Sequence, residues 1–331
     1  MTSTVETYSL DHIETAASLD ISLVVPVYNE YESISQLLDV ISSVMKTLDF
    51  TYEIICVDDG SSDGSGKLLK QFAESRQDLT AVLFRRNYGQ TAAMAAGFDY
   101  ARGDVIVTLD GDLQNDPADI PQLMNKLEEG YDLVSGWRKY RKDNQITRLL
   151  PSKLANWLIG RVTGVSLHDY GCSLKAYRTE VVRDMNLYGE LHRFLPVLAF
   201  IEGARIAEIP VKHHARQFGK SKYGLGRTFR VVMDLMTVYF MKRFLTKPMH
   251  VFGLLGVLSM IAGICAGTYL TVLKFWTGQD IGDRPLLILA IVLFLTGIQL
   301  FSFGLLAELL MRTYHESQKR PIYRVRQVIR S

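Results

Sequence analysis

Two carboxylates separated by one glycine follow a short apolar segment of the chain. Asp110-Gly111-Asp112 comes directly after Val105 to Leu109, a run typical of a buried strand. Two residues of extended chain span about 6 to 7 Å, which places both carboxylates at one strand end. Mg²⁺ and Mn²⁺ prefer a few carboxylates together with phosphate oxygens, so the pair is suited to a metal-bound nucleoside diphosphate. Asp-Gly-Asp is also a common solvated turn, but its position favours the metal site.

Two other predicted strands end in similar turn-forming, acidic sequences. Asp58 opens the run Asp58-Asp59-Gly60-Ser61-Ser62-Asp63-Gly64, and Pro26-Val27-Tyr28-Asn29-Glu30 follows the first strand. A carboxylate such as Asp58 accepts hydrogen bonds from a base or a ribose, and the glycines let backbone approach a ligand. Ligands of open parallel sheets bind beyond the carboxyl ends of the strands. The three strand ends together therefore predict a nucleotide-sugar pocket.

The elements that must position these residues alternate between strands and helices. Short β-branched runs at 21–25, 52–57, 80–84 and 105–109 are each followed by a helical stretch. The first helix has apolar residues at helical spacing from Ile34 to Leu48, and Asn29 is its predicted N-cap. This alternation predicts an α/β domain with a mainly parallel, Rossmann-like sheet.

Charge is distributed unevenly along the 331 residues, of which 48% are hydrophobic and 22% charged. Up to Gly203 the chain has 19 basic and 29 acidic residues, and after it 18 basic and 6 acidic ones. The acidic first part argues against a nucleic-acid-binding protein. Two uncharged 23-residue segments, Val251 to Leu273 and Pro285 to Ala307, are long enough to cross a bilayer.

The flanks of these two segments predict the orientation in the membrane. The connecting loop has two basic and two acidic residues, whereas the tail from Arg312 has six basic residues and one acidic residue. The positive-inside rule then puts both outer flanks in the cytoplasm. Residues 1–20 contain no signal peptide, and three distant cysteines suggest neither disulfides nor a zinc site. We therefore expect a two-span protein of the cell (inner or plasma) membrane with a cytoplasmic catalytic domain.

These patterns divide the chain into five segments. Residues 228–246 are apolar with interspersed charges, which is typical of a helix in the membrane interface. The expected segments are a flexible N-terminus (1–20), a catalytic domain (21–226), a juxtamembrane interface helix (227–248), a two-helix transmembrane hairpin (249–311) and a basic cytoplasmic tail (312–331).

Basic side chains gather in two loops that could receive a phosphate. One begins at Arg138, and the other contains Arg216, Ser221 and Lys222 just before the predicted interface helix. Lysine, arginine and backbone amides bind phosphate well, and a lipid phosphate would arrive from the headgroup layer. The alternative is attraction to anionic lipid, worth about 1 kcal/mol per residue. We favour phosphate capture.

Several ordered motifs make the sequence resemble the inverting family 2 glycosyltransferases with the GT-A fold. Within this family it looks most like the membrane enzymes that load a sugar onto a polyprenyl phosphate, such as bactoprenol glucosyl transferases and aminoarabinose transferases, and more distantly like dolichyl-phosphate mannose synthase. The matching strings are VVPVYNE (24–30), VDDGSSDGS (57–65), RRNYGQTAAMAAGFDYARGD (85–104), TLDGDLQNDP (108–117), DYGCSLKAYR (169–178) and RQFGKSKYG (216–224).

The resemblance implies a role for each matched position. Pro26, Tyr28, Glu30 and Asp58 would line the nucleobase and ribose pocket, and Asp110, Gly111 and Asp112 would meet the diphosphate. The metal, Mg²⁺ or Mn²⁺, would be held by Asp110 and Asp112 with support from Gln114. Asp169 lies where inverting relatives place a catalytic base. A phosphate monoester is already largely a dianion at neutral pH, because its second pKa is about 6. Asp169 is therefore either a base or an orienting group.

The implied reaction is an in-line transfer of a sugar from a nucleoside diphosphate to undecaprenyl or dolichyl phosphate. The first expectation is glucose from its uridine diphosphate, and the alternatives are aminoarabinose from a uridine diphosphate or mannose from a guanosine diphosphate. A processive polysaccharide synthase is disfavoured, since the sequence lacks Gln-x-x-Arg-Trp and has only two spans. A non-catalytic membrane scaffold is disfavoured because the aspartates are intact.

Partners follow from the predicted reaction and from the first span. Two spans are too few to move the product across a membrane, so a separate flippase and a later glycosyltransferase are expected. Ser259, Gly263 and Gly267 recur every four residues, a spacing that lets helices approach closely. This stripe serves either the hairpin itself or a homo-oligomer, and we expect a homo-oligomer.

Overall fold

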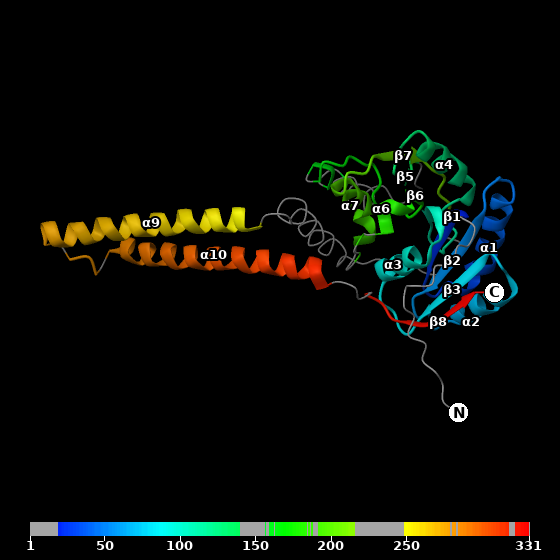
Figure 1. Cartoon of the computed structure of the whole chain (residues 1–331), viewed down its shortest axis with the longest axis horizontal. Coiled ribbons are helices and arrows are strands. Elements are labelled where there is room, and N and C mark those ends of the chain that lie inside the picture. The colour runs from blue at the N-terminus through cyan, green and yellow to red at the C-terminus, as the bar shows by residue number, and fades with distance from the viewer. Residues whose placement is uncertain are drawn as a thin grey trace, which may run out of the picture. The chain divides into compact units, whose positions relative to one another are not determined.

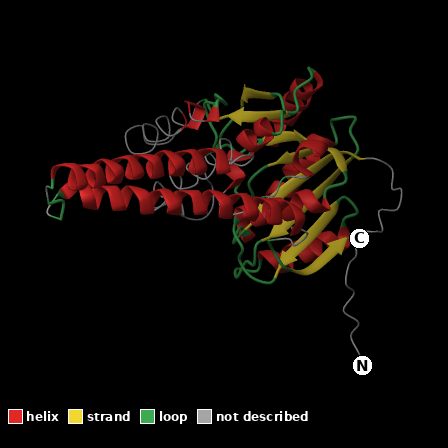
Figure 2. Ribbon diagram, turned by 60° about the vertical axis from the view of Figure 1, so that its left-hand side comes forward, coloured by secondary structure: helices red, strands yellow, loops and turns green. Residues whose placement is uncertain are grey.

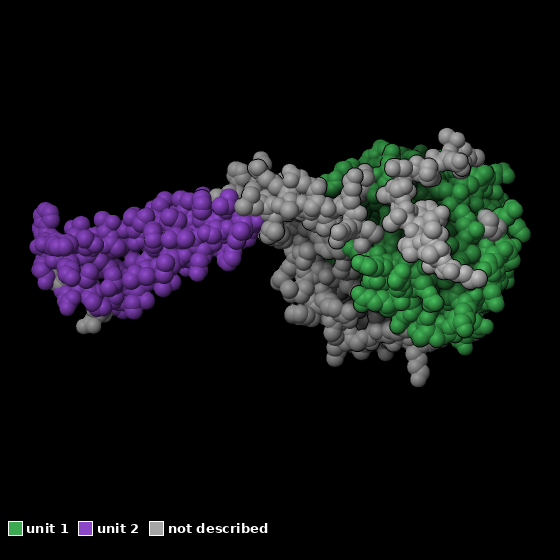
Figure 3. All heavy atoms as spheres, turned by 60° about the horizontal axis from the view of Figure 1, so that its bottom comes forward, with its two compact units in different colours: residues 1–230, 321–331 green, residues 231–320 purple. Residues whose placement is uncertain are grey.

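The computed structural model describes two compact units. The described residues are 19–139, 156, 159–161, 163–183, 185, 187, 191–215, 248–278, 280–282, 284–317 and 322–330. One unit comprises residues 1–230 and 321–331, and the other residues 231–320 (Figure 3). Of the predicted interface helix, residues 227–247 lie outside the described residues, as do Arg216, Ser221 and Lys222.

The first unit is built on one eight-stranded mixed sheet (Figures 1 and 2). Its order is β7-β5-β6-β4-β1-β2-β3-β8, with parallel pairing of β1 to β2 and β4, of β2 to β3 and of β5 to β7. Strands β6 and β8 pair antiparallel to their neighbours. The predicted mainly parallel α/β sheet is thus confirmed. The strands are β1 (Leu19–Val27), β2 (Tyr52–Asp58), β3 (Leu79–Phe84), β4 (Gly103–Thr108), β5 (Leu133–Trp137), β6 (Lys175–Arg178), β7 (Ile206–Pro210) and β8 (Val325–Arg330).

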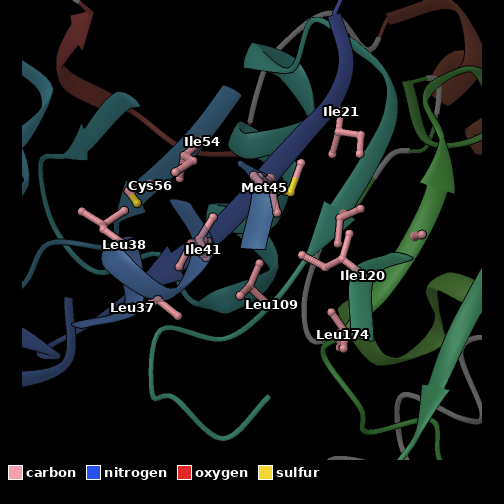
Figure 4. Close-up of a cluster of buried hydrophobic side chains, with 14 of the residues drawn as sticks. Ile21, Leu37, Leu38, Ile41, Met45, Ile54, Cys56, Leu109, Ile120 and Leu174 are labelled. Carbon is pink, nitrogen blue, oxygen red and sulfur yellow. The ribbon is translucent and has the colours of Figure 1, made fainter. Parts of the chain in front are cut away.

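Helices connect the strands and cover the sheet. Helix α1 places its apolar stripe, including Leu37, Leu38 and Ile41, in the main hydrophobic core against the strands (Figure 4). This is the face predicted from the spacing of its apolar residues. The helices of this unit are α1 (Tyr31–Met45), α2 (Ser65–Ser75), α3 (Gln90–Tyr100), α4 (Ile120–Glu128), α6 (Thr179–Arg183) and α7 (Leu195–Ile201), with 3₁₀ turns η1 (Pro117–Asp119) and η3 (Leu191–Phe194).

Helix α1 is not capped as the sequence predicts. Glu30, not Asn29, is its N-cap residue, and Asn29 adopts a left-handed φ of 54°. The Asn29 side chain instead accepts a hydrogen bond from the Ser62 amide at 2.8 Å. The Tyr31 amide at the start of α1 donates to Asp63 Oδ2 at 3.0 Å. A side chain from the loop after β2 therefore satisfies the helix terminus, a long-range partner that local spacing does not predict.

The C-terminal residues are not only a basic tail. Helix α10 continues to Ser317, beyond the expected end of the hairpin at residue 311, and β8 then pairs antiparallel with β3. Arg330 Nε donates to Thr80 Oγ1 at 3.0 Å, and Arg330 Nη2 lies 3.6 Å from Glu53 Oε2. The predominantly basic composition of this segment gives no indication of the apolar residues in β8, the strand that covers the edge of β3.

The second unit is a hairpin of two long apolar helices, α9 (Pro248–Thr277) and α10 (Pro285–Ser317). The segments 252–277 and 285–307 are long and apolar enough to cross a membrane. Ser259 Oγ donates to the Leu293 carbonyl at 2.8 Å, and a Cβ at Gly263 would lie 2.8 Å from the Ala290 carbonyl oxygen. Nothing would lie within 4 Å of a Cβ at Gly267. Two members of the predicted stripe thus serve contact within the hairpin and give no support to contact between copies.

We predict that Gly297→Val destabilises the hairpin. A Cβ there would lie 2.4 Å from Met260 Cγ and 2.7 Å from the Gly256 carbonyl oxygen, so the helices must separate. Overpacking of this kind costs about 1 to 3 kcal/mol. Gly267→Val is the matched control, because space is open there. Thermal unfolding of the full chain in detergent should show a lower midpoint for Gly297→Val only. Equal midpoints for the two variants would contradict the helix contact.

Candidate active site

The three predicted strand ends meet at one edge of the sheet. Val27 of β1 is in register with Asp58 of β2, and Val24 is in register with Thr108 of β4. The segments that follow these strands are therefore neighbours, as predicted. Ser33 Oγ donates to the Gly111 carbonyl at 2.7 Å, and a Cβ at Gly111 would lie 3.3 Å from the Pro26 carbonyl oxygen. Glycine thus permits the close approach of the Asp110–Asp112 turn to the end of β1.

Within the predicted nucleoside pocket, Asp58 is buried and Tyr28 is exposed. Asp58 Oδ1 accepts a hydrogen bond from the Ser61 amide at 3.2 Å, and burial raises the pKa of this carboxyl. Pro26 and Glu30 are half-buried beside the same loops. The Glu30 amide donates to Ser65 Oγ at 3.1 Å, which ties the end of β1 to the start of α2.

Asp59 is a site residue that the sequence analysis missed. It is 3% exposed and accepts hydrogen bonds from the Tyr88 amide at 2.6 Å and the Gly89 amide at 2.9 Å. Burial raises its pKa. Asp59 therefore holds the loop after β3 against the pocket. In the sequence, only the position of Asp59 directly after Asp58 indicates that a second carboxylate takes part in this site.

Asp110 and Asp112 remain half-exposed at the end of β4. Gln90 Nε2 donates to Asp110 Oδ1 at 2.8 Å, and the Gln114 amide donates to Asp112 Oδ1 at 3.1 Å. At this turn Gln114 thus contacts Asp112 through its backbone amide. Gln90, at the start of α3, is a second residue that the sequence analysis missed.

A divalent ion fits this donor set. Asp110 and Asp112 offer hard carboxylate oxygens that reach solvent, as Mg²⁺ and Mn²⁺ require. Among the described residues, no group of three His, Cys, Asp or Glu side chains could hold a metal alone. An ion at Asp110 and Asp112 would therefore need further ligands, such as the phosphate oxygens of a nucleotide.

Arg138 and Asp169, predicted in separate roles, form a buried bidentate ion pair. Arg138 Nε lies 2.6 Å from Asp169 Oδ2, and Arg138 Nη2 lies 2.9 Å from Oδ1. The side chains are 14% and 6% exposed. Burial lowers the pKa of Arg138, but the hydrogen bonds and charge of Asp169 outweigh it, so the net shift is upward. The guanidinium and the carboxylate thus fix each other's orientation.

The turn that carries Asp169 is held from two sides, by Glu208, which lies outside the quoted motifs, and by Lys175, which lies within DYGCSLKAYR but received no predicted role. Glu208 of β7 accepts hydrogen bonds from the His168 and Asp169 amides, each at 3.0 Å. Lys175 of β6 is 3% exposed and donates to the carbonyls of Cys172 and Tyr170. Burial lowers the pKa of Lys175.

Other conspicuous side chains have structural contacts. Trp137 stacks on His168 with ring centroids 4.2 Å apart, and Cys172 is buried with a pKa raised by burial to about 11. His213 forms an isolated bridge with Asn115, and the His214 amide donates to the Gln114 carbonyl at 2.9 Å. The segment after β7 therefore lies beside the Asp110–Gln114 turn.

Residues 22–185 match the model of glycosyl transferase family 2, and residues 247–312 match that of the GtrB C-terminal hairpin. The dodecaprenyl-phosphate galacturonate synthase of Rhizobium johnstonii is 47% identical over 315 residues, which cover 94% of this chain and 93% of that protein. The undecaprenyl-phosphate 4-deoxy-4-formamido-L-arabinose transferase of Klebsiella pneumoniae is 40% identical over 312 residues, which cover 94% of each chain.

Solved structures share the fold of the first unit. Glucosyl-3-phosphoglycerate synthase from Mycobacterium tuberculosis, solved with Mn²⁺, uridine diphosphate and glucosyl-3-phosphoglycerate, has a TM-score of 0.52 and 20% identity. The match covers 68% of this chain and 80% of that one. This likeness confirms the predicted GT-A fold.

We predict that Arg138→Met destabilises the first unit. The variant leaves the Asp169 carboxylate buried without its guanidinium partner, and removing one member of a buried ion pair costs about 3 to 5 kcal/mol. The double variant Arg138→Met/Asp169→Asn should recover part of this loss, since no charge is then left behind. Thermal unfolding of the three proteins measures both effects. If the double variant were less stable than Arg138→Met, the loss could not be attributed to the unpaired Asp169 carboxylate.

Proposed function

The chain belongs to glycosyl transferase family 2, among the polyprenyl-phosphate sugar transferases, and we propose that it transfers galacturonate from a uridine diphosphate donor to a polyprenyl phosphate. The observation that carries this choice of sugar is the 47% identity, across nearly the whole of both chains, to a dodecaprenyl-phosphate galacturonate synthase. The sequence-based expectation of glucose is not supported, because the two relatives are named for galacturonate and for a formamido-arabinose. The alternative of a sugar other than glucose fits better.

The donor side of the proposed site lies at the carboxyl ends of the adjacent strands β1, β2 and β4. Pro26, Tyr28, Glu30 and Asp58 would bind the nucleoside, and the Asp110–Asp112 turn would bind the diphosphate. A divalent ion at Asp110 and Asp112, when bound, would offset the negative charge that develops on the leaving diphosphate. The mycobacterial glucosyl-3-phosphoglycerate synthase, which shares the fold, was solved with Mn²⁺ and with Mg²⁺. Metal dependence is part of this proposal.

On the acceptor side we propose that Arg138 captures the lipid phosphate and that Asp169 holds Arg138 in place. Asp169 Oδ2 accepts from Arg138 Nε, and Oδ1 accepts from Arg138 Nη2 and from the Gly171 amide at 3.2 Å. Both oxygens of this carboxylate are thus engaged by donors, as suits a group that orients Arg138. The acceptor needs no base, because the second pKa of a phosphate monoester is about 6. Arg216, Ser221 and Lys222 remain predicted phosphate ligands.

The proposed reaction is one in-line displacement. A phosphate oxygen of the lipid forms a bond to the anomeric carbon while the bond from that carbon to the diphosphate oxygen breaks. The bonding electrons leave with the nucleoside diphosphate, so the configuration at the anomeric carbon inverts. The protein's part is to orient both phosphates and to stabilise the leaving group.

The two apolar helices and the membrane-lipid acceptors of the relatives support a membrane protein with a GT-A domain outside the bilayer. We propose that this domain faces the cytoplasm at the cell membrane. The lipid-linked product would then need a flippase and a later glycosyltransferase to be used on the other side.

The donor prediction is tested with purified full-length protein in detergent, polyprenyl phosphate, Mg²⁺ or Mn²⁺, and labelled uridine and guanosine diphosphate sugars. Label should enter the lipid fraction from UDP-galacturonate. Asp112→Asn should lower turnover at least about 100-fold, because it weakens leaving-group stabilisation. The exposed Asp104→Asn is the matched control. If label entered the lipid only from another donor, the sugar of that donor would replace galacturonate in the proposed reaction. If the protein bound nucleotide but transferred no sugar, a non-catalytic scaffold would be favoured.

The role of Asp169 is tested by the pH dependence of Asp169→Asn. If Asp169 orients Arg138, the kcat of the variant should be about 100-fold lower than that of the wild type. This ratio should stay constant between about pH 6.5 and 8.5, because the phosphate acceptor is already deprotonated across this range. The ratio of wild-type to variant kcat is the measurement. A ratio that shrinks as the pH rises would instead assign Asp169 as a base.

A further inference from the structure

We propose that the C-terminal strand is part of the donor site, and that Tyr323 is the positioning residue through which it acts. Tyr323, just before β8, holds the segment Arg85–Gly89, which we call the β3–α3 loop. This loop reaches Asp110 through Gln90, the residue after it. The effect on donor binding rests on the proposed function, whereas the effect on the loop does not.

Tyr323 contacts both elements that flank the β3–α3 loop. Its side chain is 7% exposed, and its ring stacks on Phe84, the last residue of β3, with centroids 5.1 Å apart and 16° between the planes. Its hydroxyl donates to Asp99 Oδ2, near the end of α3, at 2.6 Å. One side chain from the end of the chain thus fixes the strand before the loop and the helix after it.

The loop between these two contacts is held against the site by short, specific interactions. Tyr88 packs edge-on against Phe84 at 5.6 Å, and its amide and that of Gly89 donate to Asp59. A Cβ at Gly60 would lie 2.4 Å from the carbonyl carbon of Arg86, so the loop backbone lies directly on the glycine of the β2 loop. A shift of Phe84 would therefore move the loop relative to Asp59 and Gly60.

Gln90 connects the loop to the proposed diphosphate site. It is the first residue of α3, and its Nε2 donates to Asp110 Oδ1 at 2.8 Å. This hydrogen bond fixes one oxygen of the Asp110 carboxylate, which the proposed function assigns to the metal and diphosphate. The contacts therefore run without a break from Tyr323 through Phe84 and Asp99 to the loop, then to Gln90 and Asp110.

Strand β8 keeps Tyr323 in place. It pairs with β3 from Thr80 to Phe84, and the Arg85 amide donates to the Arg324 carbonyl at 3.2 Å (Figure 1). Pairing thus extends to the first residue of the loop. Among the described strands β8 pairs in the sheet with β3 and not with the central strands β1, β2 and β4, so loss of Tyr323 should loosen the loop and leave the centre of the sheet intact.

The first test is hydrogen exchange of the full-length protein in detergent. In Tyr323→Ala the amides of residues 85–91 should exchange about tenfold faster, because the stack and the Asp99 hydrogen bond are both lost. Val328→Ala, on the exposed face of β8, is the matched control and should leave these amides unchanged. Tyr323→Phe keeps the stack and should give a smaller increase. Unchanged exchange at 85–91, or equal acceleration across β1, β2 and β4, would overturn the proposal.

The second test is binding of uridine diphosphate with Mg²⁺, measured by calorimetry. Tyr323→Ala and Gln90→Ala should each raise Kd about fivefold, and the double variant should raise it no further, because both act through Asp110. The KM for polyprenyl phosphate should stay the same. An unchanged Kd in Tyr323→Ala would overturn the donor-site role. If the wild type bound no nucleotide, the proposed function would fail, and hydrogen exchange would still decide whether Tyr323 positions the loop.

Discussion

The parallel pairing of β1 with β2 on one side and β4 on the other is the constraint on which the site depends. It brings Asp58, Asp59, Asp110 and Asp112 to one edge of the sheet. Carboxylates gathered in this way repel one another and lose hydration, so each needs a donor. Backbone amides supply it for Asp58, Asp59 and Asp112, and Gln90 supplies it for Asp110. The loops after the strands are shaped by this requirement.

Much of the fold and the donor edge follows from local sequence, because a strand, its turn and its helix are neighbours in the chain. The strand ends, the apolar face of α1 and the two long apolar helices are all predicted in this way. Contacts between distant residues are not. Arg138 and Asp169 are 31 positions apart, and no pattern within either segment indicates that each is the other's partner. The Asp63 side chain, which accepts a hydrogen bond from the first amide of α1, is missed for the same reason.

The composition of the C-terminal segment also led to a wrong prediction, because a segment rich in basic residues there forms a paired strand. The last residues are strongly basic, which indicates a solvated tail. Val325, Val328 and Ile329 do not follow the two-residue period of a strand, so the segment cannot be predicted as one without knowing that β3 has an open edge.

The position of β8 has a consequence for biosynthesis. Strand β3 reads Leu-Thr-Ala-Val-Leu-Phe, without a charge, and such an edge is prone to pair with other chains until it is covered. Its cover is synthesised after both apolar helices, because β8 follows α10 in the chain. The sheet cannot be completed while the ribosome is still making the hairpin. A nascent chain stalled there would expose a strand that the finished protein hides.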